Sequence, residues 1–437
     1  MVVSMVIPIV QSFYVRSSRN SLVKNVNMMI IEESIRRKRM KVFSTHKFPV
    51  KSWCPDVEDG ALAQAENLAN LPFLFKHVAL MPDCHQGYGM PIGGVIATKG
   101  VVIPNAVGVD IGCGMSAVRT SVRVEDFDEI TLKKIMGEIR DEIPVGFKHR
   151  KENCDEEELP NLVDVAEKIP MVEPEDLFIQ NEMDSARKQL GTLGGGNHFI
   201  EIQKGSDGFV WVMIHSGSRN LGKKVADHYN KIAVDLNEKY HSSVPKEHQL
   251  AFLPLNTQEA RNYLAEMNYC VEFAKANRKK MMSDIERIFR DNGIRFMQTS
   301  YRFDIAHNYA RMENHFGENV MIHRKGATSA KEFEFGIIPG SMGSSSYIVR
   351  GLGNPESFCS CSHGAGRKMG RNEAQKKLIL EDEIKRLDEQ GIIHGVRNVS
   401  DLDEATGAYK DINEVMNNQK DLVEIVVELK PLGVIKG

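Results

Sequence analysis

One histidine near the end of the chain stands in a run of small residues, and this setting is suited to chemistry on phosphate. The stretch is Ser360-Cys-Ser-His363-Gly-Ala-Gly-Arg367. Glycines allow backbone conformations that other residues resist, and the freed N–H groups can gather around phosphate oxygens. An unhindered imidazole beside such a cradle can attack phosphorus and form an N–P bond. Taken alone, a buried histidine in a tight glycine turn explains the stretch better, but the other motifs reverse that preference.

Further stretches place metal-capable side chains beside glycines or at predicted strand ends. One thiolate, one carboxylate and three imidazoles would suffice for two divalent ions if the thiolate bridged them. Thiolate and imidazole suit zinc, iron or cobalt, whereas carboxylate with open positions suits manganese or magnesium. An ion near a phosphoryl group would polarise its oxygens, so the predicted chemistry is metal-assisted phosphoryl or nucleotidyl transfer. Each residue alone is more often structural, but their shared setting favours a metal site composed of Asp110, Cys113, His198, His215 and His307.

Several basic residues follow or flank glycine and serine turns and are candidates for binding a substrate phosphate. Arginine binds phosphate through two parallel hydrogen bonds, which makes Arg219 and Arg367 natural clamps if they point into a cleft. Lys325 and Arg350 lie in similar positions. For these two, a solvated surface charge is nearly as good an explanation.

Composition describes an ordinary globular protein. The chain has 437 residues, 42% hydrophobic and 26% charged, with a formal net charge of -3. No global basic field indicates nucleic acid, so any polyanion site must be a local patch. The seven cysteines form no regular framework, which suits a reducing compartment, and Cys359-x-Cys361 is too close for a standard structural zinc pair. No apolar run reaches the length of a membrane span, and we expect a cytoplasmic protein.

Hydrophobic patterning predicts an α+β protein in which β-sheets are flanked by helices. Glycine loops that carry polar residues recur from 83 to 366, so they cannot be divided between independent domains. A surface loop is expected at 149–158. The predicted helices cover 61–76, 222–240, 258–291, 304–310 and 372–390, and the predicted strands cover 94–98, 100–103, 422–429, a short segment before Asp83 and a hairpin whose second strand ends at His215.

The first 39 residues differ from the rest and are predicted to be peripheral. They contain a short apolar run and two basic clusters, and a compact beginning at Met40 looks more natural. We therefore divide the chain into an extension, 1–39, with a translation start assigned too early, and one catalytic domain, 40–437. An ordinary N-terminal helix over 29–38 is the alternative. Truncation to Met40 is expected to leave folding and activity intact.

Six motifs in one order resemble the RtcB-type tRNA-splicing and RNA-repair ligases, and the resemblance extends from about residue 42 to the terminal Lys436-Gly437. The motifs are Met81-Pro-Asp-Cys-His-Gln-Gly, Gly108-Val-Asp-Ile-Gly-Cys-Gly-Met115, Gly191-Thr-Leu-Gly-Gly-Gly-Asn-His-Phe-Ile-Glu201, His215-Ser-Gly-Ser-Arg219, Pro339-Gly-Ser-Met342 and Ser360-Cys-Ser-His-Gly-Ala-Gly-Arg367.

The resemblance implies a GTP- and manganese-dependent enzyme with two manganese ions. Asp110, Cys113 and His198 would hold one ion, and Cys113, His215 and His307 the other. His363 would become guanylylated, with Asp83 orienting it. The residues implied to bind GMP are Asn197, His198, Phe199, Ile200, Glu201, His307, Asn308, Pro339, Gly340, Ser341, Met342, Ser346, His363, Gly364, Ala365, Gly366 and Lys436.

The implied reaction joins RNA ends. His363 attacks the α-phosphorus of GTP, GMP passes to an RNA 3′-phosphate, and the 5′-hydroxyl of a second RNA displaces GMP. A 2′,3′-cyclic phosphate is opened first. Arg219 and Arg367 are the candidates for binding RNA phosphate, an archease-like activator is a possible partner, and a monomer is expected. The alternative is a dinuclear metallophosphoesterase that opens cyclic phosphates without joining ends and has no need of His363.

Overall fold

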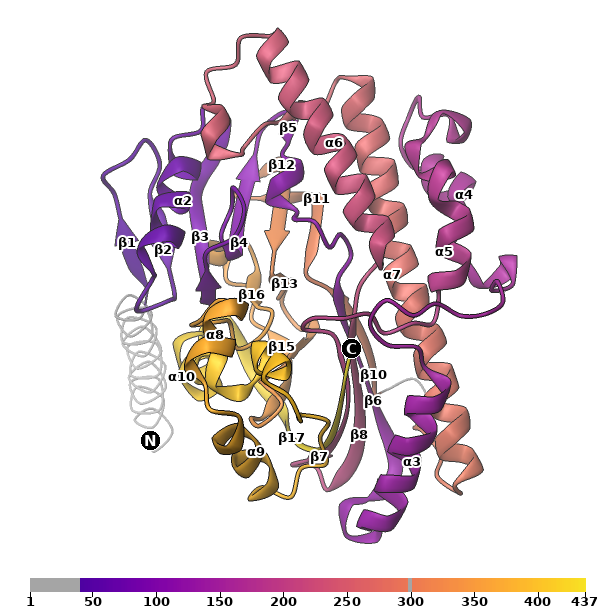
Figure 1. Ribbon diagram of the computed structural model, residues 1–437. Coiled ribbons are helices and arrows are strands. Elements are labelled where there is room, and N and C mark those ends of the chain that lie inside the picture. The colour runs from indigo at the N-terminus through magenta and orange to yellow at the C-terminus, as the bar shows by residue number, and fades with distance from the viewer. Residues whose placement is uncertain (1–39, 298–300) are drawn as a thin grey trace, which may run out of the picture. The chain divides into compact units, whose positions relative to one another are not determined.

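The computed structural model describes residues 40–297 and 301–437, which form the coloured ribbon of Figure 1. The predicted extension, 1–39, lies outside the described residues. Residues Val42–Gly437 form one compact unit, and its sheets with flanking helices confirm the predicted α+β class. Of the helices that the structure describes, none is both long enough and apolar enough to cross a membrane.

A six-stranded sheet carries the N-terminal part of the site. The helix predicted over 61–76 is present as α2 (Asp59–Ala69), which buries Ala61, Ala65 and Leu68 on one face, but residues 74–76 belong instead to strand β3 (Leu74–His85). Strand β3 is buried along nearly its whole length, including the polar His77 and Asp83, and the apolar run Val78-Ala-Leu-Met81 lies at its centre. The strand order is β1 (Lys41–Phe43), β2 (Val50–Ser52), β3 (Leu74–His85), β4 (Ile92–Thr98), β12 (Glu318–Lys325), β11 (Asn308–His315).

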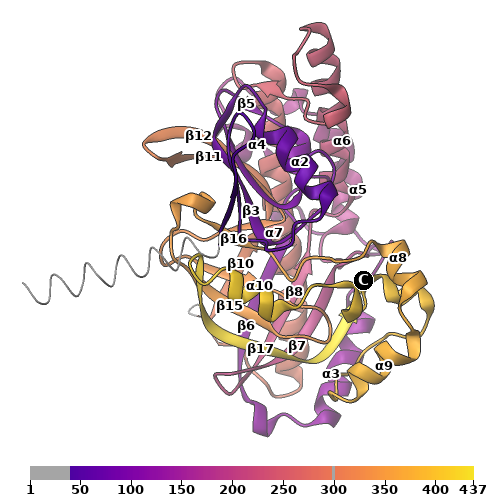
Figure 2. The same cartoon turned by 90° about the vertical axis from the view of Figure 1, so that its left-hand side faces the viewer.

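A seven-stranded sheet carries the remaining part of the site. The predicted hairpin is present as β7 (Phe199–Gly205) and β8 (Phe209–Ser216), and the second strand includes His215. The predicted strand at 422–429 is part of the longer β17 (Val423–Lys436), the long yellow strand of this sheet in Figure 2. The strand order is β10 (Arg302–Ala306), β6 (Gly114–Arg123), β8 (Phe209–Ser216), β7 (Phe199–Gly205), β17 (Val423–Lys436), β15 (Ser346–Gly351), β14 (Phe335–Ile338).

Helix α7 (Gln258–Asp291) links the two sheets. It begins where the Thr257 hydroxyl accepts a hydrogen bond from the Ala260 N–H, as an N-cap. It packs beside α6 (Asn220–Lys239), and it contacts β6 and β8 of the larger sheet and β11 of the smaller one (Figures 1 and 2). Both helices match their predicted ranges.

The helix predicted around His307 is wrong. The structure has strand β10 up to Ala306 and strand β11 from Asn308, with His307 between them. Phe303 and Ile305 alternate with more exposed residues, and this period of two is the pattern of a strand rather than of a helix.

The helix predicted over 372–390 is divided in two. Helix α8 (Arg371–Lys377) ends where Leu378 becomes extended, with φ −84° and ψ 147°, and α9 (Leu380–Asp388) follows. The extended backbone directs Leu378 onto Gly407. The predicted loop at 149–158 is irregular apart from one 3-10 turn. The remaining elements are α3 (Glu129–Glu142), α4 (Leu162–Ala166), α5 (Met183–Gln189), α10 (Ile412–Asn418), β5 (Val101–Val102), β9 (Leu253–Pro254), β13 (Ala327–Ser329) and β16 (Ser360–Ser362).

Candidate active site and metal centre

A tight turn before β6 brings Asp110 and Cys113 together. The Cys113 N–H donates to the Asp110 carbonyl at 3.1 Å, and Gly112 between them has φ +76°. A Cβ at Gly112 would lie 2.8 Å from the Cys270 carbonyl oxygen of α7, so only glycine fits. The turn is therefore pressed against α7, with the Cys113 thiol at the start of a central strand.

Two histidines face this thiol from the β7–β8 hairpin. His198 Nδ1 contacts the Leu193 carbonyl and His215 Nδ1 contacts the Asn197 carbonyl, each at 3.0 Å. Because these carbonyls can only accept, both Nδ1 atoms carry the proton and both Nε2 atoms are free to ligate. The Nε2 atoms lie 3.5 Å (His198) and 3.3 Å (His215) from Cys113 Sγ.

His307 completes the group from the junction of β10 and β11. The backbone N–H of His307 donates to the Cys113 carbonyl at 2.9 Å, and the centroid of its ring lies 5.2 Å from that of His215. The ring is buried and Nδ1 has no hydrogen-bond partner in the described part of the chain. A buried polar atom without a partner is costly, so this nitrogen is suited to a ligand that the protein alone does not supply.

The donor set fits a divalent ion. Ligand atoms of Cys113, His198 and His215 all lie within 4.8 Å of one another. Asp110 Oδ2 lies 3.2 Å from His198 Nε2. Burial lowers the pKa of His215 and of His307, which keeps both imidazoles in the neutral form that binds metal. Burial and the nearby Asp110 raise the pKa of the Cys113 thiol, and a bound cation would oppose both effects.

The predicted nucleophile lies at the edge of this group. The ring centroids of His363 and His307 are 4.9 Å apart. Asp83 Oδ2, at the end of β3, lies 2.7 Å from His363 Nδ1 and accepts hydrogen bonds from the backbone N–H groups of His363 and Gly364 at 3.1 and 3.3 Å. Burial by itself would raise the pKa of Asp83, but the His363 ring, with His85 and Lys410, holds it below its ordinary value. An ionised Asp83 can only accept, so His363 Nδ1 is protonated and Nε2 carries the free lone pair.

The remaining residues implied to bind GMP lie on three loops and on the adjacent strands β7, β17 and β15. The Ser346 hydroxyl accepts a hydrogen bond from the Gly340 N–H at 3.1 Å and so closes the loop that contains Ser341. Lys436 pairs with Phe199 across β17 and β7, and its ammonium lies 5.8 Å from the Phe199 ring centroid. A cavity of about 350 Å³ is lined by 13 residues, among them Met342, Lys436 and Glu404.

Asn308 is brought to the metal group but its side chain is already bonded within the protein. Its Nδ2 donates to the Asp110 carbonyl at 3.0 Å and its Oδ1 accepts from the Gly326 N–H at 2.8 Å. The structure thus gives Asn308 a positioning contact to a predicted metal ligand.

The two predicted RNA-binding arginines differ in position. Arg219 donates to Thr192 Oγ1 and to the Gly146 carbonyl at 3.0 and 3.3 Å. Its positive charge is among the effects that lower the pKa of Asp110. All guanidinium nitrogens of Arg367 are bonded within the 367–409 region, including an ion pair with Glu404 at 3.2 Å. The structure thus brings Arg219 to the metal group and directs Arg367 away from it.

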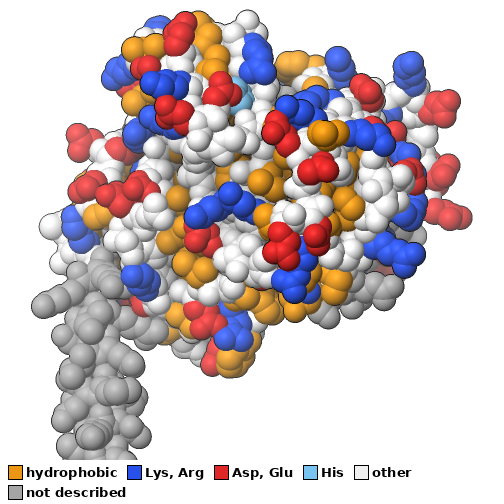
Figure 3. Space-filling view, turned by 90° about the horizontal axis from the view of Figure 1, so that it is seen from below, with side chains coloured by type: hydrophobic (Ala, Val, Ile, Leu, Met, Phe, Trp, Pro, Cys, Tyr) orange, Lys and Arg blue, Asp and Glu red, His pale blue; other side chains and the backbone are white. Residues whose placement is uncertain are grey.

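The other two basic candidates lie outside this group. Lys325 is buried and donates to backbone carbonyls, whereas Arg350 pairs with Glu424. On the face shown in Figure 3, basic and acidic side chains are interspersed.

Sequence reasoning missed two supporting residues on α7. Arg278 is buried and donates to the Gly112 and Ser216 carbonyls at 3.2 and 3.0 Å. Asn277 bonds the N–H groups of Gly191 and Thr192 at 2.7 and 3.1 Å. Both occupy positions of the apolar repeat of α7, and polar residues at such positions are a signal that could have found them.

Comparisons with known proteins show which family the sequence matches. The family model described as "tRNA-splicing ligase RtcB" matches residues 64–437. An RNA-splicing ligase RtcB of Escherichia coli K12 is 40% identical, with 91% of this chain and 99% of the relative covered. The tRNA-splicing ligases RtcB of Nanoarchaeum equitans and Thermococcus kodakarensis are 34% and 32% identical, each with 87% of this chain and 92% of the relative covered. The chain belongs to the RtcB family.

Proposed function

We propose that this chain is a GTP- and manganese-dependent RNA ligase that acts in RNA repair or tRNA splicing. It joins an RNA 3′-phosphate or 2′,3′-cyclic phosphate end to a 5′-hydroxyl end. Family membership supports the ligase class, since the relatives carry RNA-splicing and tRNA-splicing ligase names. The observation that carries the proposed mechanism is the contact of His363 Nδ1 with the buried Asp83 at 2.7 Å, beside a metal-capable group.

The proposed metal ligands divide into two sets that share the Cys113 thiolate. Asp110 and His198 would hold one manganese ion, and His215 and His307 would hold the other. The fit rests on the free Nε2 atoms of His198 and His215, the unpartnered Nδ1 of His307 and the mixed donor set. When bound, such ions neutralise phosphate oxygens and so lower the barrier to attack at phosphorus.

His363 is the proposed nucleophile of the first step. Asp83 accepts the Nδ1 proton and directs the Nε2 lone pair outward. Attack by Nε2 on the α-phosphorus of GTP forms the N–P bond, the bond from that phosphorus to the bridging oxygen breaks, and pyrophosphate leaves. Asp83 stabilises the positive charge that develops on the ring, as an orienting carboxylate does in other nucleophilic sites.

The guanylate is proposed to occupy the cavity beside Lys436. Its volume of about 350 Å³ falls in the range of small-ligand sites. Lys436 supplies a positive charge, and the Gly340–Met342 loop contributes the Met342 side of the cavity. Phe199 and Glu201 lie on β7, the strand that pairs with β17, which carries Lys436.

In the second step GMP passes from His363 to the RNA 3′-phosphate. In the third step the 5′-hydroxyl attacks the phosphorus of that 3′-phosphate and GMP leaves. Arg219 is the better placed of the two arginines to bind RNA phosphate.

Incubation with α-labelled GTP and manganese tests the proposal. Label should remain on the wild-type protein through denaturation and should be absent from His363→Ala. The labelled protein should then join a 3′-phosphate RNA to a 5′-hydroxyl RNA without further GTP. Metal-dependent opening of a cyclic phosphate that survives His363→Ala, with no label on the wild type, would instead identify a phosphoesterase.

A further inference from the structure

Lys410 connects the two segments that form the His363–Asp83 pair. Its backbone N–H donates to the Gly366 carbonyl at 2.9 Å, in the glycine turn after His363. Its ammonium donates to the Cys84 carbonyl at 2.6 Å and lies 3.4 Å from the Pro82 carbonyl. One residue therefore contacts the turn and the carbonyl groups of both residues next to Asp83.

The ammonium is directed wholly into this junction. Its third contact is Cys54 Sγ, at 3.4 Å. A hydrogen bond from the Cys84 thiol lowers the pKa of Cys54 to about 6, and the charge of Lys410 acts in the same direction against the effect of burial. Three acceptors match the three N–H groups of an ammonium, and together they fix the position of a side chain that is otherwise flexible.

Close packing makes the position of Asp83 critical for His363. Gly366 has φ +74°, and a Cβ there would overlap the Asp83 backbone carbonyl. The single carboxylate oxygen Oδ2 meets three donors, two on His363 and one on Gly364. A small displacement of the end of β3 would therefore weaken every contact that orients the ring.

We propose that Lys410 is a positioning residue for guanylylation, which clamps the backbone on both sides of Asp83 and thereby aligns His363. This inference rests on the proposed function. Lys410 does not touch the reacting atoms. Its role is to hold the carboxylate in place, since misplacement of a reacting group by about 1 Å can cost on the order of 100-fold in rate.

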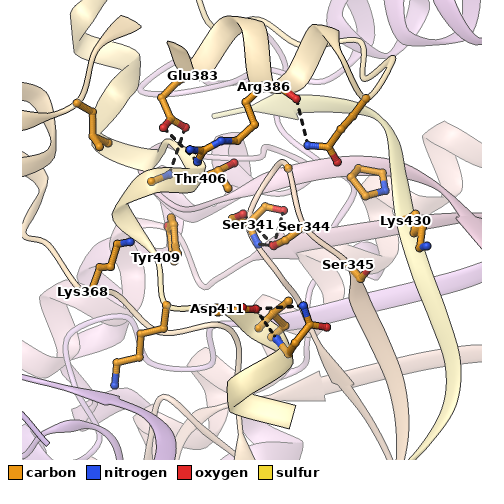
Figure 4. Close-up of a pocket in the computed structure, with 18 of the residues that line it drawn as sticks. Ser341, Ser344, Ser345, Lys368, Glu383, Arg386, Thr406, Tyr409, Asp411 and Lys430 are labelled. Carbon is orange, nitrogen blue, oxygen red and sulfur yellow. Dashed lines mark hydrogen bonds and ion pairs between the residues drawn. The ribbon is translucent and has the colours of Figure 1, made fainter. Parts of the chain in front are cut away.

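A neighbouring cavity makes this role testable by chemical rescue. Lys410 lines a cavity of about 900 Å³, together with Lys368, Tyr409 and Asp411, which Figure 4 labels. Shortening Lys410 to alanine should open its space to this cavity. A small alkylammonium ion could then enter and donate to the Cys84 and Pro82 carbonyls.

The experiment compares single-turnover guanylylation in Lys410→Ala, in the similarly sized Lys410→Met and in the wild type. Both variants should be slowed about 100-fold with little change in the GTP concentration at half-maximal rate. Ethylammonium should restore at least a tenth of the rate to Lys410→Ala, whereas tetramethylammonium, which has no N–H group, should not. Lys368→Ala is the matched control, because its side chain lines the same cavity and makes no hydrogen bond or ion pair within the described residues; it should react like the wild type.

A second readout does not depend on activity. In the wild type, the His363 Nδ1 proton should give a downfield proton resonance that His363→Ala lacks, and this resonance should weaken or disappear in Lys410→Met. Guanylylation at the wild-type rate in both Lys410 variants would overturn the inference. A loss of rate that no amine restores, in a variant that keeps the resonance, would also overturn it. Absence of label on the wild type would instead contradict the proposed function, and the resonance would then decide the role of Lys410.

Discussion

The site has two halves that orient their imidazoles in different ways. The metal half contains Asp110, Cys113, His198, His215 and His307, and the nucleophile half contains Asp83 and His363. In the metal half, His198 and His215 are oriented by neutral backbone carbonyls of the glycine-rich loop before the β7–β8 hairpin. In the nucleophile half, His363 is oriented by the carboxylate of Asp83, a residue that is fully buried. A carbonyl is fixed once the backbone has folded, whereas a buried charge must itself be stabilised. The metal half therefore depends on backbone geometry, and the nucleophile half depends on a few charged contacts.

The largest effect is expected from His363→Ala, which removes only the proposed nucleophile. Labelling by GTP should fall below detection because the variant lacks the imidazole that is proposed to accept the guanylyl group. Manganese binding, measured by metal analysis after gel filtration, should stay at the wild-type level because the five metal-half side chains are unchanged. Loss of bound manganese in this variant would show that the two halves are not separable.

A smaller loss in guanylylation is expected from Cys113→Ala, and here the metal should also be lost. The thiol is the shared neighbour of His198 and His215, so the variant should bind at most one manganese ion per chain. Guanylylation should slow by about 1000-fold or more, since charge neutralisation at phosphorus supplies several kcal/mol. Cys154→Ala, remote from both halves, should retain the metal and the activity. Full manganese content in Cys113→Ala would contradict the shared-ligand arrangement.

Asp83→Asn should remove the carboxylate from the nucleophile half while keeping the size of the side chain. The amide keeps the size of the carboxylate but loses its charge and presents an N–H donor in place of one oxygen. Guanylylation should fall by about 100-fold to 1000-fold, because the ring loses its preferred tautomer and the stabilisation of its positive form. Manganese content should not change. An undiminished rate would mean that the three contacts to Oδ2 do not orient His363 for reaction.

The sequence was most informative where chemistry requires rare residue types. The stretches around Asp110, His198, His215 and His363 could be singled out because glycines adjoin ionisable groups, and the structure brings all of them together. Helices α6 and α7 followed from long periodic patterns. These patterns could not show which distant residues lie close together in space. Asp83 and His363 are separated by 280 positions in the sequence, and the packing of β3 against β16 brings them together.

The differences between the sequence predictions and the structure have two causes, a misread local period and missing tertiary contacts. Around His307, Phe303 and Ile305 alternate with more exposed residues, which is the pattern of a strand, and the ladder with β6 agrees with it. Arg367 follows the glycine turn in sequence, yet its guanidinium is directed toward Glu404 and Tyr409. Lys410 lies in a segment with no unusual composition, so its contacts on both sides of Asp83 had no sequence signal.

The smallest predicted effect concerns a second buried carboxyl, Glu201, and it sharpens the comparison with Asp83. Burial raises the pKa of Glu201 to about 8, because the hydrogen bond from the Gln203 amide and the charge of Lys436 offset burial only in part. The pKa of Asp83 is instead lowered by a direct imidazole contact. The same burial thus gives opposite charge states at neutral pH.

Stability should therefore depend on pH in opposite senses at the two carboxyls. Between the ordinary glutamate pKa of 4.5 and about 8, folding takes up a proton at Glu201, so this residue makes the protein less stable as pH rises through that window. Glu201→Gln removes the titration. The stability of this variant relative to wild type, measured by urea unfolding at pH 5.5 and 7.5, should increase with pH by at most about 1.4 kcal/mol per unit. Asp83 contributes stability that is lost only as pH falls below its ordinary pKa, so Asp83→Asn should show no such increase over the same interval. A pH-independent difference for Glu201→Gln would mean that Lys436 keeps the Glu201 carboxylate ionised, as His363 does for Asp83.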